Sequence, residues 1–274
     1  MSENSPFKQD LFAGHVVAIT GGGSGINLGI AKVFAGLGAS IAICGRTQSR
    51  LDEAAAQLRD LGARTFAQVA DVRDPAAVEA FLTGSEASLG PVDVMVCGAA
   101  GNFLVPAEKL SPNGFRTVVD IDLMGSFHAA RAAHAQLVKT RGLILFLSAA
   151  QSYMPHAYQV HAAAAKAGID AMMRNLALEW GRFGIRVNSI APGPIEGTEG
   201  LSRLSDPNQR EALVQSIPLK RLGQMQDVGQ LAAFLASPAG SFVSGAMISC
   251  DGGQALAGSA PMNATISRLL ASPL

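Results

Sequence analysis

A glycine-rich segment near the N-terminus has the residue types of an anion site. Thr20 ends an apolar, β-branched run, and a helical pattern of apolar residues begins at Ile26. Glycines between them permit a tight turn and let the backbone N–H groups of a helix N-terminus approach a phosphate. A turn without a ligand is the alternative, but the place after a first strand favours a dinucleotide site. The predicted cofactor contacts are Gly21, Gly23, Ser24, Gly25 and Ile26.

A second signal follows the next apolar run, about twenty residues further along the chain, where an NAD site has an acidic residue for the ribose hydroxyls. The sequence there is Cys44-Gly45-Arg46-Thr47, without an acid. Because the Arg46 guanidinium suits a 2′-phosphate, NADP(H) is the predicted cofactor. A solvated charge at a helix start would explain Arg46 but not the missing acid. Asp71 and Val72, after the third apolar run, are predicted to lie at the adenine.

These residues need a scaffold of alternating strands and helices. Seven short apolar runs are predicted strands: His15–Thr20, Ser40–Cys44, Thr65–Val69, Val92–Cys97, Leu143–Leu147, Ile185–Ile190 and Ala246–Cys250. Helical patterns fill the intervals, over Ile26–Leu37, Gln48–Leu61, Ala76–Ser88, Ser111–Lys139, Tyr158–Arg182 and Met225–Ala236. Continuous apolarity is typical of parallel strands buried on both faces. The prediction is one α/β domain over residues 1–274, with a doubly wound, parallel, seven-stranded Rossmann-type sheet.

Composition limits the function classes. The 274 residues include 21 basic and 21 acidic side chains, and 49% of them are hydrophobic. This neutral balance argues against nucleic-acid binding and a polybasic membrane surface, and no apolar run reaches the ~18–20 residues of a membrane span. The three cysteines have no metal-ligand spacing, so no metal site is predicted. Without a secretory signal at the start or a peroxisomal address at Ser272–Leu274, a cytoplasmic protein is expected.

The motifs resemble those of the short-chain dehydrogenase/reductase family over nearly the whole chain. The family's TGxxxGxG motif matches Thr20–Asn27, with Asn27 in place of the last glycine. Its asparagine-rich stretch matches Cys97–Ala100 loosely, and its PG motif matches Pro192–Ile195. The resemblance implies a homotetramer that packs through the two long helices. It also implies nicotinamide-cofactor contacts at Ala99, Lys166, Pro192, Gly193 and Ile195.

The catalytic positions depart from the family pattern. Ordinary members place a tyrosine four residues before a lysine, so that the phenol donates a proton to a developing alkoxide. Lys166 matches the lysine, but Ala162 stands at the tyrosine position. The serine of the fifth strand falls at Ala149, one residue after Ser148, and the helix asparagine falls at Asp122. The phenolic acid is missing, and a carboxylic acid has been gained.

One branch of the family has this combination. Segments of the chain resemble 2,4-dienoyl-CoA reductases, most closely the peroxisomal type: Ala99–Leu104, Asp120–Asp122, Gln159–Ala162 and Ala191–Leu201. The resemblance implies that NADPH delivers hydride to the δ-carbon of a dienoyl thioester, in the degradation of unsaturated fatty acids. Asp122 would relay a proton through a water to the dienolate carbon, and Lys166 would orient the nicotinamide ribose. A helix carboxylate bonded to its neighbours is the alternative for Asp122.

Four residues are predicted to contact the acyl-CoA substrate: Asn102, Phe103, Ser148 and Tyr158. By resemblance Phe103 packs on the acyl chain, although a loop aromatic that covers the core has the same sequence signal. Tyr153 is a further candidate for contact with the thioester.

Two features near these residues have a simpler interpretation. His161 is expected to cap or pack rather than to act as a base. Residues 196–220 are predicted to be a loop that closes over the substrate. Arg203 and Arg210 within it are either contacts to CoA phosphates or solvated surface arginines.

Two other functions stay open. An ordinary carbonyl reductase or alcohol dehydrogenase would recruit Tyr153 or Tyr158 as its acid, although neither lies four residues before Lys166. A catalytically idle NADP(H)-binding regulator would explain the lost tyrosine, but not the retained Lys166 and the gained Asp122. The length and branching of the acyl chain, and the position of the product double bond, are not fixed by the sequence.

Overall fold

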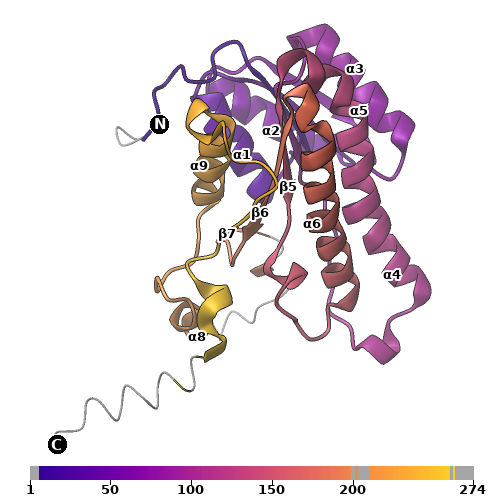
Figure 1. Ribbon diagram of the computed structural model, residues 1–274, viewed down its shortest axis with the longest axis vertical. Coiled ribbons are helices and arrows are strands. Elements are labelled where there is room, and N and C mark those ends of the chain that lie inside the picture. Colours follow the sequence, from indigo (N-terminus) through magenta and orange to yellow (C-terminus); the bar gives the residue numbers. More distant parts are fainter. Residues whose placement is uncertain (1–5, 199–200, 203–209, 260–261, 263–274) are drawn as a thin grey trace, which may run out of the picture.

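Seven strands form one parallel sheet in the computed structural model, which describes residues 6–198, 201–202, 210–259 and 262 (Figure 1). The order is β3-β2-β1-β4-β5-β6-β7, so the chain reverses its direction of growth between β1 and β4. This confirms the predicted Rossmann-type sheet. The strands are β1 (Val16–Thr20), β2 (Ser40–Gly45), β3 (Thr65–Val69), β4 (Val94–Cys97), β5 (Leu143–Leu147), β6 (Arg186–Pro192) and β7 (Met247–Cys250).

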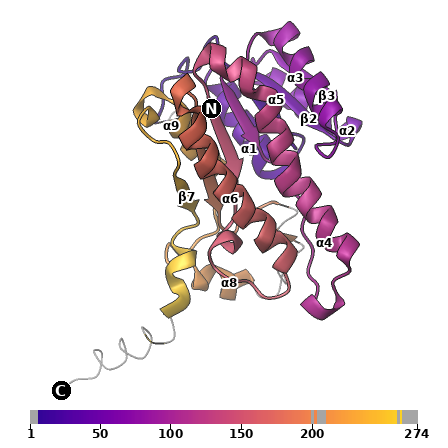
Figure 2. The same cartoon turned by 45° about the vertical axis from the view of Figure 1, so that its right-hand side comes forward.

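Helices cover both faces of the sheet (Figures 1 and 2). One face packs against α1 (Gly25–Gly36), α2 (Gln48–Asp60) and α9 (Met225–Ala236). The other packs against α3 (Pro75–Leu89), α5 (Gly125–Thr140) and α6 (Val160–Trp180). Every residue of β1, β4 and β5 is buried, which explains why these strands are continuously apolar rather than alternating. Among the described helices, none is both long and apolar enough to cross a membrane.

The strand register brings the loops with functional residues to one edge. Thr20 at the end of β1 lies opposite Cys44 of β2 and Cys97 of β4. Leu147 at the end of β5 lies opposite Ile190 near the end of β6. Ligands of doubly wound sheets bind at the carboxyl ends of the strands, next to the reversal of strand order. The segments predicted to bind cofactor and substrate all leave the sheet at this edge.

The predicted long helix over Ser111–Lys139 is interrupted. It consists of α4 (Pro112–Val119), a π-helical turn at Asp120–Met124, and α5. Ser111 and Pro112 begin it as predicted, and the Ser111 hydroxyl accepts a bond of 3.0 Å from the Gly114 N–H. π-turns within helices occur frequently at functional sites, and this one contains Asp122.

The segment predicted as a loop over residues 196–220 contains a helix, α8 (Arg210–Ser216). Both views place α8 at the end of the molecule where α6 begins (Figures 1 and 2). Closure of this segment over a substrate stays a prediction. Arg203, one of the two arginines predicted to meet CoA phosphates, lies outside the described residues.

Candidate active site

The turn between β1 and α1 has the shape of a phosphate cradle. Gly21 and Gly25 have φ angles of 70° and 57°, which residues with a Cβ rarely adopt. A Cβ on Gly21 would lie 3.0 Å from Ala99 Cα, and one on Gly22 would lie 2.5 Å from Ile43. The turn therefore requires glycine, both for its conformation and for its close approach to the end of β4.

The N-terminus of α1 leaves its amides available. Ser24 is extended at the N-cap position, and its side chain makes no capping hydrogen bond. The first backbone N–H groups of a helix have no partner within the helix, and their partial positive charge favours an anion. Ser24 is exposed, so the turn leaves room for an anion such as a dinucleotide pyrophosphate, and the contacts of Gly21 to Ile26 with it stay a prediction.

Asn27, which replaces the last glycine of the family motif, braces this cradle. Its Nδ2 donates to the carbonyl of Gly21 at 3.2 Å and to the carbonyl of Gly98 at 2.9 Å. Thr20 adds a second link, because its Oγ1 accepts from the N–H groups of Gly98 (3.0 Å) and Ala99 (3.3 Å). Side chains thus tie the glycine turn to the end of β4, and the substitution has a structural use that the motif did not predict.

The predicted adenine end of the site has two basic residues around one acid. Asp71 accepts from Arg73 through both carboxylate oxygens, at 3.0 and 2.5 Å. This hydrogen bonding to Arg73 lowers the Asp71 pKa, and the charge of Arg46 lowers it further. Arg46 is exposed at the end of β2, so its guanidinium is accessible to a ligand. Val72 is buried, and its carbonyl is bonded to the His128 ring.

The PG segment after β6 lies against the end of β7. The Gly193 N–H donates to the Cys250 carbonyl, and a Cβ on Gly193 would lie 2.7 Å from Asp251 Cα. Ile195 is buried. A cavity of about 550 Å³ opens here between the strand ends and the start of α9, lined in part by Gly193, Pro194, Ile195, Ser249, Asp251 and Gly253.

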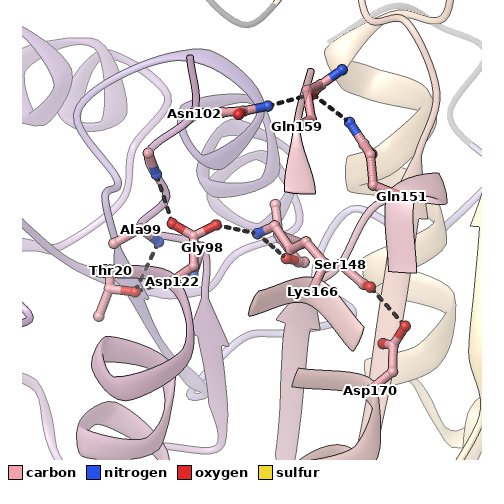
Figure 3. Close-up of polar contacts among 12 residues, drawn as sticks. Thr20, Gly98, Ala99, Asn102, Asp122, Ser148, Gln151, Gln159, Lys166 and Asp170 are labelled. Carbon is pink, nitrogen blue, oxygen red and sulfur yellow. Dashed lines mark hydrogen bonds and ion pairs between the residues drawn. The ribbon is translucent and has the colours of Figure 1, made fainter. Parts of the chain in front are cut away.

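The structure brings Asp122 and Lys166 together as a buried ion pair (Figure 3). Lys166 Nζ lies 3.1 Å from Asp122 Oδ2 and donates to the Leu147 carbonyl at 2.9 Å. Asp122 Oδ1 accepts from the Gly101 N–H at 2.7 Å. Asp122 is 1% exposed and Lys166 is 9% exposed. The pair therefore joins the π-turn, α6, the end of β5 and the loop after β4.

Ser148 is hydrogen-bonded within the protein, whereas the sequence predicted that it contacts the substrate. Its hydroxyl donates to Asp170 at 2.8 Å, and Ser189 donates to the other oxygen of the same carboxylate at 2.7 Å. All three side chains are buried. No hydrogen bond joins Ser148 to Asp122 or Lys166, because its hydroxyl is directed to Asp170. This places its hydroxyl in the packing between α6 and the sheet.

Three amide side chains join the loops around the ion pair (Figure 3). Gln159 Oε1 accepts from Asn102 Nδ2 at 2.6 Å and from Gln151 Nε2 at 3.1 Å. The three residues come from the loop after β4, the turn after β5 and the residue before α6. Asn102 Oδ1 is buried and has no hydrogen-bond partner. Asn102 is thus close to the predicted catalytic segments and has an acceptor that nothing within the described chain satisfies.

Phe103 covers a buried histidine. The ring centroids of Phe103 and His161 are 4.3 Å apart, and Phe103 is 39% exposed whereas His161 is 0% exposed. Both ring nitrogens of His161 lack a hydrogen-bond partner of ordinary geometry. Burial lowers the His161 pKa, while the Phe103 backbone and the charge of Asp122 act in the opposite direction. The packing role expected for His161 accounts for its carbon atoms but not for its nitrogens.

Tyr153 and Tyr158 take no part in the contacts of the buried Asp122–Lys166 pair. Tyr158 is 59% exposed, has a φ angle of 66°, and is held through its backbone carbonyl by the Val105 N–H. The Tyr153 hydroxyl shares a 3.0 Å hydrogen bond with Ser249 of β7. Arg210 forms a salt bridge with Glu196, and both side chains are about half exposed. None of these groups contacts Asp122 or Lys166.

Sequence reasoning missed several residues of this region. The sequence does not single out Gln151, Gln159 or Asp170 as polar contacts, and its simple interpretation of His161 as a capping or packing residue leaves the two ring nitrogens without an account. A usable signal existed for Asp170, which lies one helical turn after Lys166 on the buried face of an alanine-rich helix. An acid on such a face needs partners, so its network was open to prediction.

Comparisons with known proteins agree with this geometry. Residues 21–255 match the family model described as Enoyl-(Acyl carrier protein) reductase. The chain is 44% identical to a peroxisomal 2,4-dienoyl-CoA reductase [(3E)-enoyl-CoA-producing] of Arabidopsis thaliana, over 91% of this chain and 87% of that protein. It is 40% identical to a probable 2,4-dienoyl-CoA reductase [(2E)-enoyl-CoA-producing] of Bacillus subtilis, over 87% of this chain and 95% of that protein.

A solved structure extends the comparison to the cofactor. It is the NADPH-bound short chain oxidoreductase of Pseudomonas aeruginosa PAO1, described as containing an atypical catalytic center. The TM-score is 0.82 at 29% identity, over 88% of this chain and 97% of that one. The parallel sheet, the glycine turn and these relatives together show the family. The chain belongs to the short-chain dehydrogenase/reductase family of oxidoreductases.

Proposed function

We propose that the protein is an NADPH-dependent reductase of 2,4-dienoyl-CoA thioesters. The observation that carries the proposal is the buried Asp122–Lys166 ion pair, in which Asp122 stands at the position of the usual asparagine and Lys166 at that of the usual lysine. Ala162 at the tyrosine position is 3% exposed and carries no acid. The names of the relatives in Arabidopsis and Bacillus support the same substrate class.

The chemistry of a dienoyl thioester suits a site without a phenol. When bound, NADPH supplies the hydride, and the δ-carbon of the substrate accepts it. The negative charge that develops is delocalised onto the thioester oxygen, and the resulting dienolate takes its proton on carbon. The protein therefore needs a proton source beside the carbon chain, rather than a phenol beside a carbonyl.

The ion pair can meet this need. Lys166 Nζ lies 3.1 Å from Asp122 Oδ2, within reach for donating a proton to it, and the pair is shielded from bulk water. Asp122 relays the proton toward the substrate through a water, and Lys166 positions the nicotinamide ribose. The bonds from Gly101 and to Leu147 fix both groups without using all of their hydrogen-bonding capacity.

Asn102 and Phe103 are the substrate contacts that the geometry supports best. Both lie on the loop that also holds Asp122 through Gly101, and Phe103 and Leu104 expose apolar surface for an acyl chain. Tyr158 is exposed and stays a proposed contact at the rim. Ser148 is left out of the proposed substrate site, because Asp170 takes its hydroxyl.

NADPH is proposed over NADH because of Arg46. The end of β2 has no acid for the ribose hydroxyls, and the exposed guanidinium is complementary to a 2′-phosphate. The named cofactor of the Pseudomonas structure supports this preference.

A substrate panel tests the function. Purified protein is given NADPH with 2,4-hexadienoyl-CoA, with 3-oxoacyl thioesters and with simple aldehydes, and NADPH oxidation is followed. Turnover of the dienoyl thioester alone is expected. Turnover of the carbonyl compounds alone would point to an ordinary reductase, and cofactor binding without any turnover would point to a regulator. Analysis of the product then locates its double bond, which the relatives' names give as either (3E) or (2E).

A homotetramer in the cytoplasm completes the proposal. Apolar side chains are exposed along α4, α5 and α6, among them Phe115, Phe127, Val138, Val160 and Leu178. A cavity of about 590 Å³ lies between α4 and the start of α6, with Leu110, Phe115 and Val160 in its lining. Light scattering of the full chain measures the oligomeric state. Imaging of a tagged chain against a peroxisomal marker tests the location, since several relatives are named as peroxisomal.

A further inference from the structure

His161 is a buried titratable group for which the proposed reaction has no role. It is the second residue of α6, directly before Ala162, and it is 0% exposed. Neither ring nitrogen has a hydrogen-bond partner of ordinary geometry among the described residues, although the Phe103 backbone is near enough to raise the His161 pKa against the effect of burial. Buried polar groups of native proteins almost always have partners, and an exception calls for an explanation such as a catalytic role or a water.

The proposed reaction consumes a proton from the Asp122–Lys166 pair. Each turnover places one proton on carbon, and the Asp122–Lys166 pair is then one proton short. Asp122 is 1% exposed, and both of its oxygens already have partners within the protein. The pair must regain a proton before the next turnover, and a titratable side chain beside it can supply one.

His161 lies beside the loop that holds this pair, since its ring stacks on Phe103, and the N–H of Gly101, two residues earlier on that loop, donates to Asp122. The charge of Asp122 acts on the imidazole although no direct hydrogen bond joins them, an arrangement that a bridging water would complete. The Phe103 ring that stacks on the imidazole at 4.3 Å is itself 39% exposed, so His161 is packed against a residue of the protein surface. Asn102 Oδ1, on the residue before Phe103, offers such a water another unsatisfied acceptor.

We propose that His161 is the proton shuttle that recharges the Asp122–Lys166 pair from solvent between turnovers. The inference rests on the proposed dienoyl-CoA reduction, since only a reaction that consumes a proton requires it. A neutral imidazole accepts a proton at one nitrogen and releases a proton from the other. The proton that reaches the pair replaces the one delivered to the dienolate carbon, so the protein returns to its starting state and no further reactant is needed.

The test separates the first turnover from those that follow. His161→Phe keeps the aromatic volume next to Phe103 and removes both nitrogens. Rapid mixing of the NADPH-loaded variant with 2,4-hexadienoyl-CoA is expected to oxidise one NADPH per site at the wild-type rate. Later turnovers should be slower by about a hundredfold, the usual scale of a lost proton-transfer group. His134→Phe is the control, because His134 stacks on Trp180 and Phe183 away from the site, and it should show no burst.

A second variant tests the chemistry of the shuttle. His161→Ala should regain steady-state turnover when imidazole is added, but not with pyrazole, which has the same size and is far less basic. The inference is overturned if His161→Phe turns over at the wild-type rate, or if its first and later turnovers are slowed equally. Equal rescue by both azoles would also overturn it, since filling a cavity would then suffice. A wild-type protein that leaves 2,4-hexadienoyl-CoA unreduced is a separate outcome, which removes the proposed function itself.

Discussion

The cofactor cradle and the catalytic segment lie at the same edge of one sheet, but they are built differently. In the cradle, the backbone itself forms the surface, and Gly21 has no room for a Cβ. In the catalytic segment, single side chains reach across from separate elements, as Asp122 and Lys166 do. The cradle departs from the family motif at Asn27 alone, whereas three of the four catalytic positions differ from the usual pattern.

The contrast teaches how this fold changes its reaction. A backbone surface fails if its glycines change, so it restricts the sequence closely. A site made of side chains can be rewritten at a few positions while the strands and helices stay in place. Under the proposed function, Asp122 in place of an asparagine and Ala162 in place of a tyrosine move the proton source from a phenol to an ion pair, while the parallel sheet is retained.

The largest expected effect is a loss of turnover when the proposed catalytic acid is replaced, while cofactor binding is retained. Asp122→Ala should lower turnover of the dienoyl thioester by a factor of about 10²–10⁴, the range for a group that transfers protons. Binding of NADPH, measured by calorimetry, should stay unchanged. Asp120→Ala, two residues away on the same π-turn, is the control. A fully active Asp122→Ala protein would remove this carboxylate from the mechanism.

The second effect is a change in the preference between NADPH and NADH, with the proposed catalytic residues left in place. Arg46→Asp should shift the ratio of kcat/KM for NADPH and NADH toward NADH by roughly tenfold to a hundredfold, because a charge-assisted bond is replaced by repulsion. Arg131→Asp, on the exposed face of α5, controls for the change in net charge. An unchanged ratio would mean that another group holds the 2′-phosphate.

A smaller effect tests the brace within the cradle. Asn27→Ala removes the hydrogen bonds to Gly21 and Gly98 and should weaken NADPH binding by about tenfold, given roughly 0.5–1.5 kcal/mol for each bond. Asn175→Ala serves as the comparison, since Asn175 also donates to a backbone carbonyl, on the exposed side of α6. Equal affinities in the two variants would show that the brace does not support the cradle.

The smallest effect is a pH dependence of stability. Because burial lowers the His161 pKa, the unfolded chain binds more protons than the folded protein as the pH falls through the ordinary histidine range near 6.5. The free energy of unfolding should therefore decrease from pH 7 to pH 5, with Asp122 and the Phe103 backbone opposing the change. His161→Phe should decrease less over the same range in urea titrations. Parallel curves for the two proteins would contradict this.

The sequence predicted the sheet and the cradle well, for physical reasons. The apolar strands and the glycine turn are local patterns, and the bounds of β3, β5 and α9 agree with the prediction. The positions of Asp122 and Lys166 followed from the family resemblance. Their direct contact is a new finding, because no local pattern specifies how far two helices approach each other.

What the sequence missed depends on contacts between distant segments. The Ser148–Asp170 bond joins residues 22 apart, and the amide contact of Asn102 with Gln159 joins residues 57 apart. Whether Ser148 or Ala149 faces the site depends on the exact twist after β5, which single-residue alternation does not resolve. The helix α8 was missed because its seven residues are too few for a clear helical period.

The π-turn at Asp120–Met124 sets the helical phase of everything before it. An α-helix turns by about 100° per residue, so a deletion of one residue within this turn would rotate α4 relative to α5 by that angle. Ser111, Phe115 and Val119 would then face other neighbours, although none of them had been substituted. The register of this helix is therefore less tolerant of insertions and deletions than of point substitutions, and a change in length here would rotate the side chains of α4 relative to Asp122, which Lys166 of α6 contacts.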